Sequence, residues 1–486
     1  MRGTPTADAL ATELCARLDR LRWSSTHLSI LLMLGAGWLF DSFEVNLVGS
    51  FVGPMQKHFH ASDTQASFIF WFWLMGILVG ALAGGTLADR FGRRRLFMGT
   101  LLWYSVCTVL TGLSPTLDVL LVLRFLTGLG VGAEYSIINS AISELMPARH
   151  RGKANAGVMN FWPVGAIASA LLALLLLNTP GLSDEVSWRY GFALGGIAAL
   201  LVVFLRRRVP ESPRWLVSQG RYAEAEAIVA RLEAASGVTA GGAGSVAGTA
   251  VAPSSVGASL VELVTHCPGR LALGCALDLS EAFGYYGVFA LLSIVGFKSV
   301  GISEADIPYF FILGNVGALL GGLTMTVIVD RLGRRRVVPG FYVLAAIGAV
   351  GLGLALREHS AGLVLLAFMV GNAGATGAWT SAYPTFTELF PTHLRGAGVG
   401  FSVAVGRLGA GFGVTVVTAV GSSSSVLAAC LLVAAFWLVG AMAMVAWRLR
   451  GGMEAAGRSL EELAPVRVRA EVAAGAAVSG SGVVEL

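Results

Sequence analysis

Charged residues are scarce in this chain of 486 residues. Asp, Glu, Lys and Arg together make up 13% of it, whereas apolar residues make up 55% and the mean hydropathy is +0.73. A soluble domain typically holds about 25% charged residues. So little charge excludes an ordinary water-soluble domain and indicates that lipid surrounds most of the chain.

Lysine is nearly absent, because Lys57, Lys153 and Lys298 are the only three in the sequence. None of them lies in Gly-x-x-x-x-Gly-Lys-Ser/Thr, the loop that binds nucleotide phosphates. The chain therefore does not hydrolyse ATP through a P-loop, and any work that it performs needs another source of energy.

Cysteine is rare as well, and its five positions are scattered, mostly within or beside apolar runs: Cys15, Cys107, Cys267, Cys275 and Cys430. An odd number without paired spacing indicates neither a disulfide framework nor a metal site. We therefore expect no metal and interpret these cysteines as small hydrophobic residues.

Long apolar runs are what the sequence has in abundance. A helix needs roughly 20 apolar residues to cross the hydrocarbon core of a bilayer, and twelve such runs are present, six on each side of a stretch from Arg206 to Pro268. Their predicted starts are His27, Ala66, Leu96, Leu117, Ala154, Trp188, Gly269, Asp306, Arg336, Gly362, Gly396 and Ser424. The sequence therefore predicts an all-α membrane protein.

The distribution of arginine orients these helices. Every second loop is basic, and the basic loops contain Arg90–Arg95, Arg149–Lys153, Arg206–Arg214, Arg331–Arg336 and Arg395. By the positive-inside rule, we expect both termini on the cytoplasmic side of the plasma (inner) membrane. Basic loops beside anionic lipid also explain the net charge of +5, so nucleic acid is not an expected partner.

Two short strings each occur twice. Asp-Arg-x-Gly-Arg-Arg-Arg occupies Asp89–Arg95 and Asp330–Arg336, and Glu-Leu-x-Pro-x-x-x-Arg-Gly occupies Glu144–Gly152 and Glu388–Gly396. Each copy lies in a loop between two apolar runs, at the same place in each half of the chain. The sequence is therefore a duplication.

The first string resembles the loop between helices 2 and 3, and between helices 8 and 9, of the major facilitator superfamily of secondary transporters. Pro210–Leu216 likewise resembles the segment after helix 6 of its sugar-porter members. The resemblance implies the major facilitator fold, with twelve transmembrane helices in two pseudo-symmetric six-helix bundles. It also implies a transporter without catalytic residues, hence no enzyme, and without a cofactor, since a proton gradient supplies the energy.

The expected domain boundaries follow from the apolar runs. They are a cytoplasmic N-terminal segment (1–26), the N-terminal bundle (27–207), a cytoplasmic loop with a short helix and a flexible linker (208–268), the C-terminal bundle (269–447) and a cytoplasmic tail (448–486). The helix is predicted by helical alternation from Arg221 to Ala235, and the linker by a Gly, Ala and Ser composition from Ser236 to Ser259.

The duplicated strings place acids beside arginines at the predicted cytoplasmic helix ends, where they can form charge-assisted pairs. Such pairs serve the family as an inner latch that closes when the carrier faces outward. The expected members are Asp89, Arg90, Arg93, Glu144, Arg151, Asp330, Arg331, Arg334, Glu388 and Arg395. The alternative is that these charges only mark topology.

Acids inside the apolar runs are candidates for function, because an ionisable group deep in a bilayer is costly. Asp41 and Glu44 lie on one face of the first helix, and Asp278 and Glu281 repeat their spacing in the seventh. Repulsion and desolvation favour the protonated form of at least one carboxyl in each pair. We expect these pairs to accept protons or to contact polar groups of the solute.

Two arginines lie in the apolar runs. Arg124 and Glu134 belong to a helix-four segment that resembles a motif of metabolite and phosphate proton symporters. In those transporters the matching residues couple proton movement to transport or bind the substrate. A static ion pair is the alternative.

Arg407 lies eleven residues into the eleventh helix, which is about 16 Å from the helix start at 1.5 Å per residue. An arginine at this depth favours a solute with an anionic group. Tyr285 and Tyr286 are candidate walls for the solute.

Other aromatic residues in these runs are interpreted as residues of the membrane interface, where amphipathic rings gather. They are Trp71, Trp73, Trp162, Trp379 and Tyr135.

The sequence thus predicts a secondary active transporter that moves a small organic solute, a carboxylate-bearing metabolite, by proton symport and alternating access. Its expected partners are the solute, protons and membrane lipid, and we expect a monomer. A proton-driven drug or organic-cation antiporter is the main alternative, because five membrane acids face only two arginines. A sugar transporter or a non-transporting receptor is less favoured.

Overall fold

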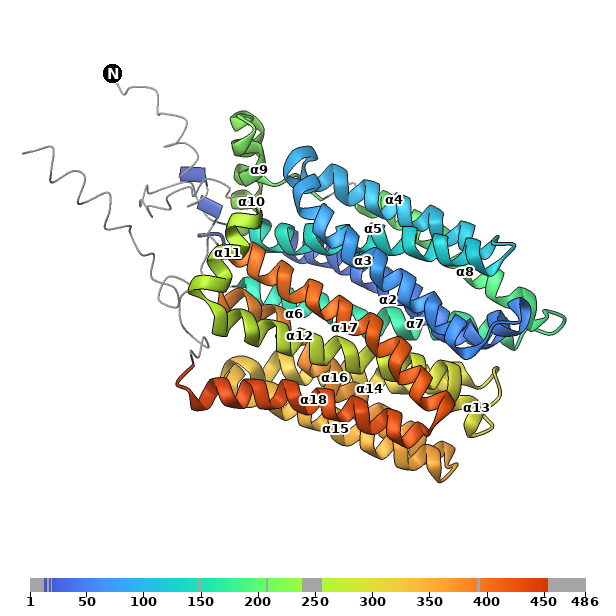
Figure 1. Ribbon diagram of the computed structural model, residues 1–486. Coiled ribbons are helices and arrows are strands. Elements are labelled where there is room, and N and C mark those ends of the chain that lie inside the picture. The colour runs from blue at the N-terminus through green and yellow to red at the C-terminus, as the bar shows by residue number, and fades with distance from the viewer. Residues whose placement is uncertain are drawn as a thin grey trace, which may run out of the picture.

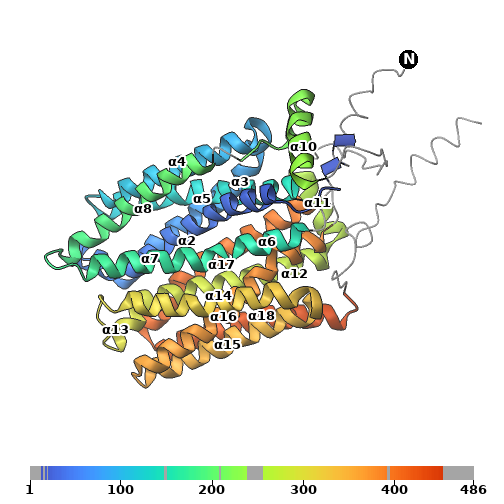
Figure 2. The same cartoon turned by 180° about the vertical axis from the view of Figure 1, so that it is seen from behind.

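The computed structural model describes residues 13–14, 17–18, 20–146, 150–206, 209–237, 256–390 and 394–452, and they are largely helical. Two bundles of helices lie side by side, the first coloured from blue to green and the second from yellow-green to red (Figures 1 and 2). The tail from residue 453 and most of the predicted linker lie outside the described residues.

Helices of the first bundle are α2 (Ser25–Phe59), α3 (Asp63–Phe91), α4 (Arg93–Gly112), α5 (Leu117–Leu145), α6 (Arg151–Met159), α7 (Phe161–Leu177) and α8 (Asp184–Arg206). Those of the second bundle are α12 (Pro268–Leu291), α13 (Phe297–Ser299), α14 (Ile307–Leu332), α15 (Arg334–Arg357), α16 (Ala361–Leu389), α17 (Arg395–Ser423) and α18 (Val426–Leu449). The π-helical turn η2 (Leu292–Gly296) joins α12 to α13.

All twelve predicted spans are present, and each predicted start lies within four residues of a helix start. Ten of the described helical spans are apolar and long enough to cross a membrane on these criteria alone. The other two are α4, which begins with three arginines, and α5, which carries Arg124 and Glu134. The fifth span is broken at Asn160 into α6 and α7, a break that was not predicted.

Three short helices lie between the bundles in sequence: α9 (Pro213–Ser218), α10 (Tyr222–Ser236) and α11 (Val256–His266). The helix predicted from Arg221 to Ala235 corresponds to α10. The predicted linker is wrong at its end, because α11 begins at Val256, where apolar residues recur at helical spacing. These helices lie at one end of the molecule, the α9–α11 end, and α13 lies at the other, the α13 end (Figure 1).

A residue of the N-terminal segment is attached to α10. Arg17 binds Glu233 through two hydrogen bonds of 2.9 and 2.6 Å and binds Glu226 at 2.9 Å. These hydrogen bonds hold the pKa of Glu233 below its ordinary value. Their contribution to stability is therefore present above about pH 4, the ordinary range of glutamate, and is lost as the pH falls through the lowered pKa.

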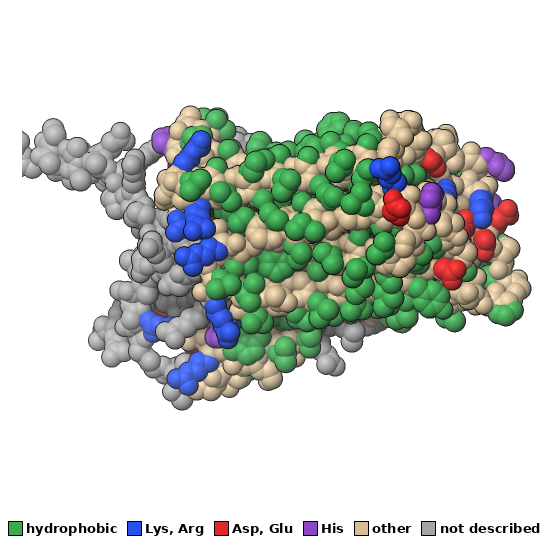
Figure 3. All heavy atoms as spheres, turned by 90° about the horizontal axis from the view of Figure 1, so that it is seen from below, with side chains coloured by type: hydrophobic (Ala, Val, Ile, Leu, Met, Phe, Trp, Pro, Cys, Tyr) green, Lys and Arg blue, Asp and Glu red, His purple; other side chains and the backbone are tan. Residues whose placement is uncertain are grey.

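The surface shows which part of the molecule contacts lipid. Apolar side chains cover a broad middle band, lysine and arginine gather at the α9–α11 end, and acids, histidines and a few cations occupy the α13 end (Figure 3). Such a band between two polar ends is typical of a protein that spans a bilayer.

Glycine lets α3 and α5 approach closely. A Cβ atom on Gly76 or Gly80 would overlap the carbonyl oxygen of Phe125 or Leu129, respectively. Small residues serve this purpose in membranes, where lipid provides no hydrophobic drive between helices.

We expect Gly80→Val to destabilise the first bundle by about 1–3 kcal/mol, because its side chain would force α3 and α5 apart. Thermal unfolding in detergent measures the effect. Gly99→Val is the matched control, since a Cβ atom on Gly99 meets nothing within 4 Å. Equal stability of the two variants would contradict the prediction.

Candidate functional site

Among the described residues, seven charged side chains are buried well inside the membrane spans, and none of them is more than 3% exposed. Asp41 and Glu44 come from α2, Arg124 and Glu134 from α5, Asp278 and Glu281 from α12, and Arg407 from α17. All seven were predicted from the sequence, because nothing about membrane topology explains a charge within an apolar run. The structure shows which of them meet.

In the first bundle, Arg124 and Glu44 form a bidentate ion pair. Arg124 Nη1 bonds to Glu44 Oε1, and Nη2 donates to Oε2 at 3.1 Å. The Arg124 Cζ atom also lies 5.8 Å from the ring centroid of Trp73 and 5.9 Å from that of Phe192. Two parallel hydrogen bonds orient both side chains, so this pair fixes how α2 lies against α5.

This pairing differs from the sequence-based interpretation, which placed Arg124 with Glu134. The two residues lie ten positions apart on α5, which corresponds to about 15 Å along the helix axis. Glu44 also has an arginine as its partner, so Asp41 and Glu44 do not form an isolated pair of acids. The buried Glu134 lies further along α5, toward the α9–α11 end.

An aromatic cage surrounds Arg407, which is completely buried. Its Cζ atom lies 5.5 Å from the ring centroid of Tyr135, 5.9 Å from that of Tyr286 and 5.1 Å from that of Trp379. These distances allow cation–π attraction. Because Tyr135 belongs to α5, while Arg407, Tyr286 and Trp379 belong to the second bundle, the cage crosses the interface between the bundles.

Sequence reasoning missed two members of this cage, Tyr135 and Trp379, by assigning them to the membrane interface. Their signal was weak, because only the fold shows which aromatic residues face Arg407. Trp38 stacks on Tyr135 with ring centroids 4.6 Å apart and an interplanar angle of 7°. Tyr135 is therefore held by a second ring on its own bundle.

Asp278 lies next to the arginine of the cage. A Cβ atom on Gly406 would overlap Asp278 Oδ2, so the carboxyl group packs directly against the residue that precedes Arg407. The charge of Arg407 acts on Asp278 electrostatically, and Asp278 acts in turn on Glu281. Among the described residues, neither carboxyl has a hydrogen-bond partner. An ionised carboxyl in such surroundings is costly.

Tyr285 joins the two bundles through a hydrogen bond. Trp162 Nε1, on α7, donates to the Tyr285 hydroxyl at 2.8 Å. The Ser42 hydroxyl donates to the Trp162 carbonyl oxygen at 2.6 Å, which ties α2 to the same place. The rings of Tyr285 and Tyr286 meet edge to face, with centroids 5.3 Å apart. Both predicted tyrosines therefore lie at the interface, one bonded across it and the other in the cage.

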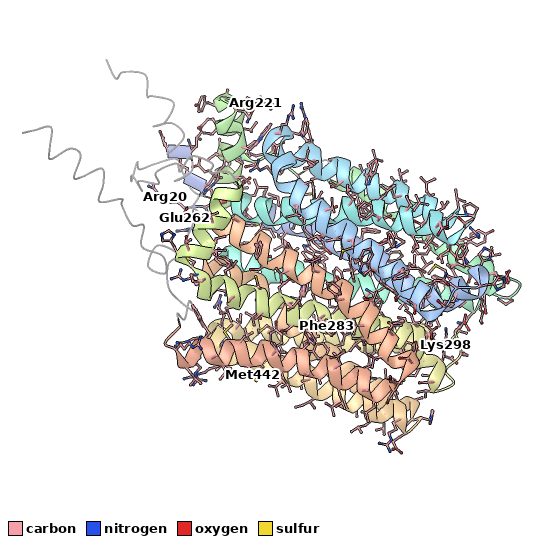
Figure 4. The ribbon with its side chains drawn as sticks, viewed as in Figure 1. Arg20, Arg221, Glu262, Phe283, Lys298 and Met442 are labelled. Atoms are coloured by element: carbon pink, nitrogen blue, oxygen red, sulfur yellow. The ribbon has the colours of Figure 1, made fainter. Side chains whose placement is uncertain are left out.

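Polar contacts also join the bundles at the α13 end, and we call them the α13-end latch. Lys57 Nζ, at the end of α2, lies 2.8 Å from Glu304 Oε1 of the second bundle. Lys298 Nζ donates to Gln56 Oε1 at 2.6 Å and lies 3.9 Å from Asp63 Oδ1. Figure 4 shows Lys298 at the end opposite Arg20, Arg221 and Glu262. Sequence analysis assigned no role to either lysine.

The inner latch predicted at the other end is only partly described. Arg93 Nη2 donates to Glu144 Oε1 at 3.2 Å, a pair within the first bundle. Arg90 and Arg331 are exposed, and Arg334 is buried. The remaining members have side chains outside the described part of the structure: Asp89, Arg151, Asp330, Glu388 and Arg395. An inner latch between the bundles therefore stays a prediction.

The described residues include no cluster of three or more His, Cys, Asp or Glu side chains that could hold a metal ion.

Comparisons with known proteins agree with this architecture. The family model of the sugar (and other) transporter matches residues 37–466. The niacin transporter NiaP of Acinetobacter baylyi is 29% identical over 404 residues, which cover 82% of the chain and 88% of that protein. Organic cation/carnitine transporter 7 of Arabidopsis thaliana is 29% identical over 426 residues, which cover 78% of the chain and 83% of that protein.

A solved structure shows the same fold. The major facilitator superfamily proton:xylose symporter XylE, bound to 6-bromo-6-deoxy-D-glucose, matches with a TM-score of 0.70 at 22% identity. The match covers 91% of this chain and 99% of that one. The predicted fold class, two six-helix bundles of the major facilitator type, is confirmed.

We expect Glu44→Gln to lower the free energy of unfolding by about 3–5 kcal/mol, because it leaves the Arg124 charge buried without its partner. The double variant Glu44→Gln/Arg124→Met removes both charges and should recover much of that loss. Chemical or thermal unfolding of both variants in detergent measures this recovery. A double variant that is less stable than Glu44→Gln would contradict a paired role.

Proposed function

Since the chain belongs to the sugar (and other) transporter family of the major facilitator superfamily, we propose that it carries a small carboxylate-bearing metabolite by proton symport. Membership of this family makes the chain a metabolite transporter and not an enzyme. The carboxylate and the proton are our own inferences, and the observation that carries them is the position of Arg407 beside Asp278.

Arg407 is suited to hold a carboxylate. Its guanidinium group keeps its charge at any physiological pH and offers a planar set of donors that matches a carboxylate. The three rings of the cage limit its motion, which reduces the entropy lost on binding. Niacin, the solute named for one relative, is a pyridine carboxylate.

Asp278 explains why a proton would accompany the anion. An ionised Asp278 competes with the solute for the charge of Arg407 and repels a second carboxylate. Once Asp278 takes up a proton, both obstacles disappear, so proton and anion bind together more favourably than either alone. Glu281 lies within electrostatic range of Asp278 and can hold or pass on a proton in the same way.

The pair of Glu44 and Arg124 provides a second point of coupling. Protonation of Glu44 would remove the ionic part of the bidentate contact and loosen α2 from α5. The static ion pair remains the alternative role for these two residues.

The contacts between the bundles support a mechanism of alternating access. The basic residues at the α9–α11 end favour a cytoplasmic location for that end and for both termini, by the positive-inside rule. In the plasma membrane, the α13 end would then face outward, and the α13-end latch closes it in this conformation. We infer that the α13 end opens only when Lys57 and Lys298 separate from their partners. The site of the monomeric carrier then changes from facing one side of the membrane to facing the other.

A cation or drug antiporter is the second candidate. One relative is named an organic cation/carnitine transporter, and the carboxyl groups of Asp278 and Glu281 could face a cation. An antiporter would move protons in the direction opposite to its solute, whereas a symporter moves both in the same direction.

The test uses proteoliposomes that contain the purified protein and a pH-sensitive dye. Small carboxylates, sugars and organic cations are added outside in turn. We expect acidification of the interior with a carboxylate, and a loss of about tenfold to a hundredfold in uptake for Arg407→Ala, the range for a charge-assisted hydrogen-bonded pair. Arg357→Ala, at an exposed helix end, is the control.

Two results would contradict the proposal. Alkalinisation with an organic cation would favour the antiporter, and unchanged carboxylate uptake by Arg407→Ala would remove the arginine from the site. Asp278→Asn separates carboxylate binding from proton coupling, because this variant should still exchange labelled carboxylate across the membrane but should no longer move protons with it.

A further inference from the structure

The last turn of α2, at the α13 end, carries a half-buried histidine that is bonded to another helix of its own bundle. Arg189 Nη2, on α8, donates to His58 Nε2 at 3.0 Å. The ring centroid of His58 also lies 5.8 Å from that of Trp188, on α8, and 4.8 Å from that of the neighbouring Phe59. His58 therefore ties the end of α2 to α8.

The hydrogen bond from Arg189 is compatible with one charge state of His58. A guanidinium group has only donors, so His58 Nε2 must accept and cannot carry a proton. Arg189 is itself held in place, because its Nη1 donates to the carbonyl oxygens of Gly112 at 2.9 Å and Ser114 at 3.0 Å. Its Cζ atom also lies 4.3 Å from the Trp188 ring centroid. A protonated His58 would set a second cation and a second N–H donor against this fixed guanidinium group.

The same turn of α2 carries part of the α13-end latch. Lys57 directly precedes His58, and its Nζ atom lies 2.8 Å from Glu304 Oε1 of the second bundle. Gln56 comes one residue earlier and accepts from Lys298 of the second bundle at 2.6 Å. These contacts are short, so a shift in the last turn of α2 changes their geometry directly.

Charged groups of other elements also act on this turn. Besides Arg189, they are Asp184 of α8 and Glu304 of the second bundle, which both act electrostatically on Lys57. Carboxyl groups ordinarily titrate near pH 4, and the side chains of lysine and arginine above about pH 10. Histidine ordinarily changes its charge between about pH 5 and 8. We therefore expect His58 to be the group of this turn that responds in that range.

Histidines gather at the α13 end (Figure 3), but two others there lack the features of His58. His359 Nδ1 donates to the Ser299 carbonyl oxygen at 2.8 Å, a hydrogen bond that both of its charge states permit. His60 directly follows α2 and is exposed. A change of charge at either residue does not oppose the contact described for it.

We propose that His58 is a pH sensor that controls the α13-end latch. Neutral His58 accepts from Arg189 and keeps the last turn of α2 where Lys57 and Gln56 reach the second bundle. When His58 takes up a proton, its bond to Arg189 breaks, the turn moves away from α8 and the latch loses its alignment. With the α13 end outward, a step that rests on the proposed function, acid outside then favours the outward-open conformation of a carrier that takes up protons.

The test is the distance between spin labels at Thr179 and Glu358, one in each bundle at the α13 end, measured in detergent by electron–electron double resonance. On lowering the pH from about 8 to about 5, we expect the ratio of longer to shorter distances to rise about tenfold, the value of one hydrogen bond to a charged group. His58→Gln keeps a neutral acceptor and should lose this rise. His58→Lys carries a charge throughout and should show the longer distance already at the higher pH.

His60→Asn is the matched control, because it removes an exposed histidine two residues away whose φ of 52° asparagine tolerates. It should respond to pH as the unmodified protein does. A response that originates in Asp278 or Glu281 would persist in His58→Gln, so the difference between that variant and the unmodified protein belongs to His58.

If His58→Lys fails to fold, as judged by thermal unfolding, His58→Gln carries the test. An equal pH response in His58→Gln and the unmodified protein, or no response in either, would overturn the proposal. The distances require no transport, so a failure of proton symport in proteoliposomes leaves this result intact.

Discussion

The cost of a charge inside a bilayer determines the arrangement of this protein. Glu44, Arg124 and Arg407 are almost completely buried, so contacts with the protein must replace the water that would otherwise solvate them. Glu44 and Arg124 satisfy each other, and Arg407 is satisfied by aromatic faces and by the nearby Asp278. These contacts determine which helices meet: α2 with α5 in the first bundle, and α17 with α12, α16 and α5 at the interface.

In the proposed function, the same contacts would link the interface between the bundles to protons and to anions. The cage takes one ring from the first bundle and two from the second, so any movement between the bundles changes the surroundings of Arg407. The α13-end latch consists of exposed or half-buried ion pairs and hydrogen bonds, which are individually weak in water. In the proposed mechanism, a barrier of this kind would open at low cost once the buried charges in the middle are neutralised.

Much of the fold could be predicted from the sequence, because membrane helices follow directly from the length of apolar runs and arginine marks the loops between them. The break at Asn160 was missed, although Pro163 in the first turn of α7 is a sign of it. The partners of the buried charges could not be predicted, because they come from different helices. Glu44 and Arg124, for example, lie 80 positions apart in the sequence. Only the fold shows the contacts of four further residues, namely Tyr135, Trp379, Lys57 and Lys298.

The most direct test of this account is the distance between the bundles at both ends, measured by electron–electron double resonance. Spin labels at Thr179 and Glu358 report on the α13 end, and labels at Arg95 and Arg336 report on the α9–α11 end. The account predicts that Lys57→Gln/Lys298→Gln lengthens the first distance and shortens the second, as one end opens and the other closes. Two unchanged distances, or two that lengthen together, would contradict it.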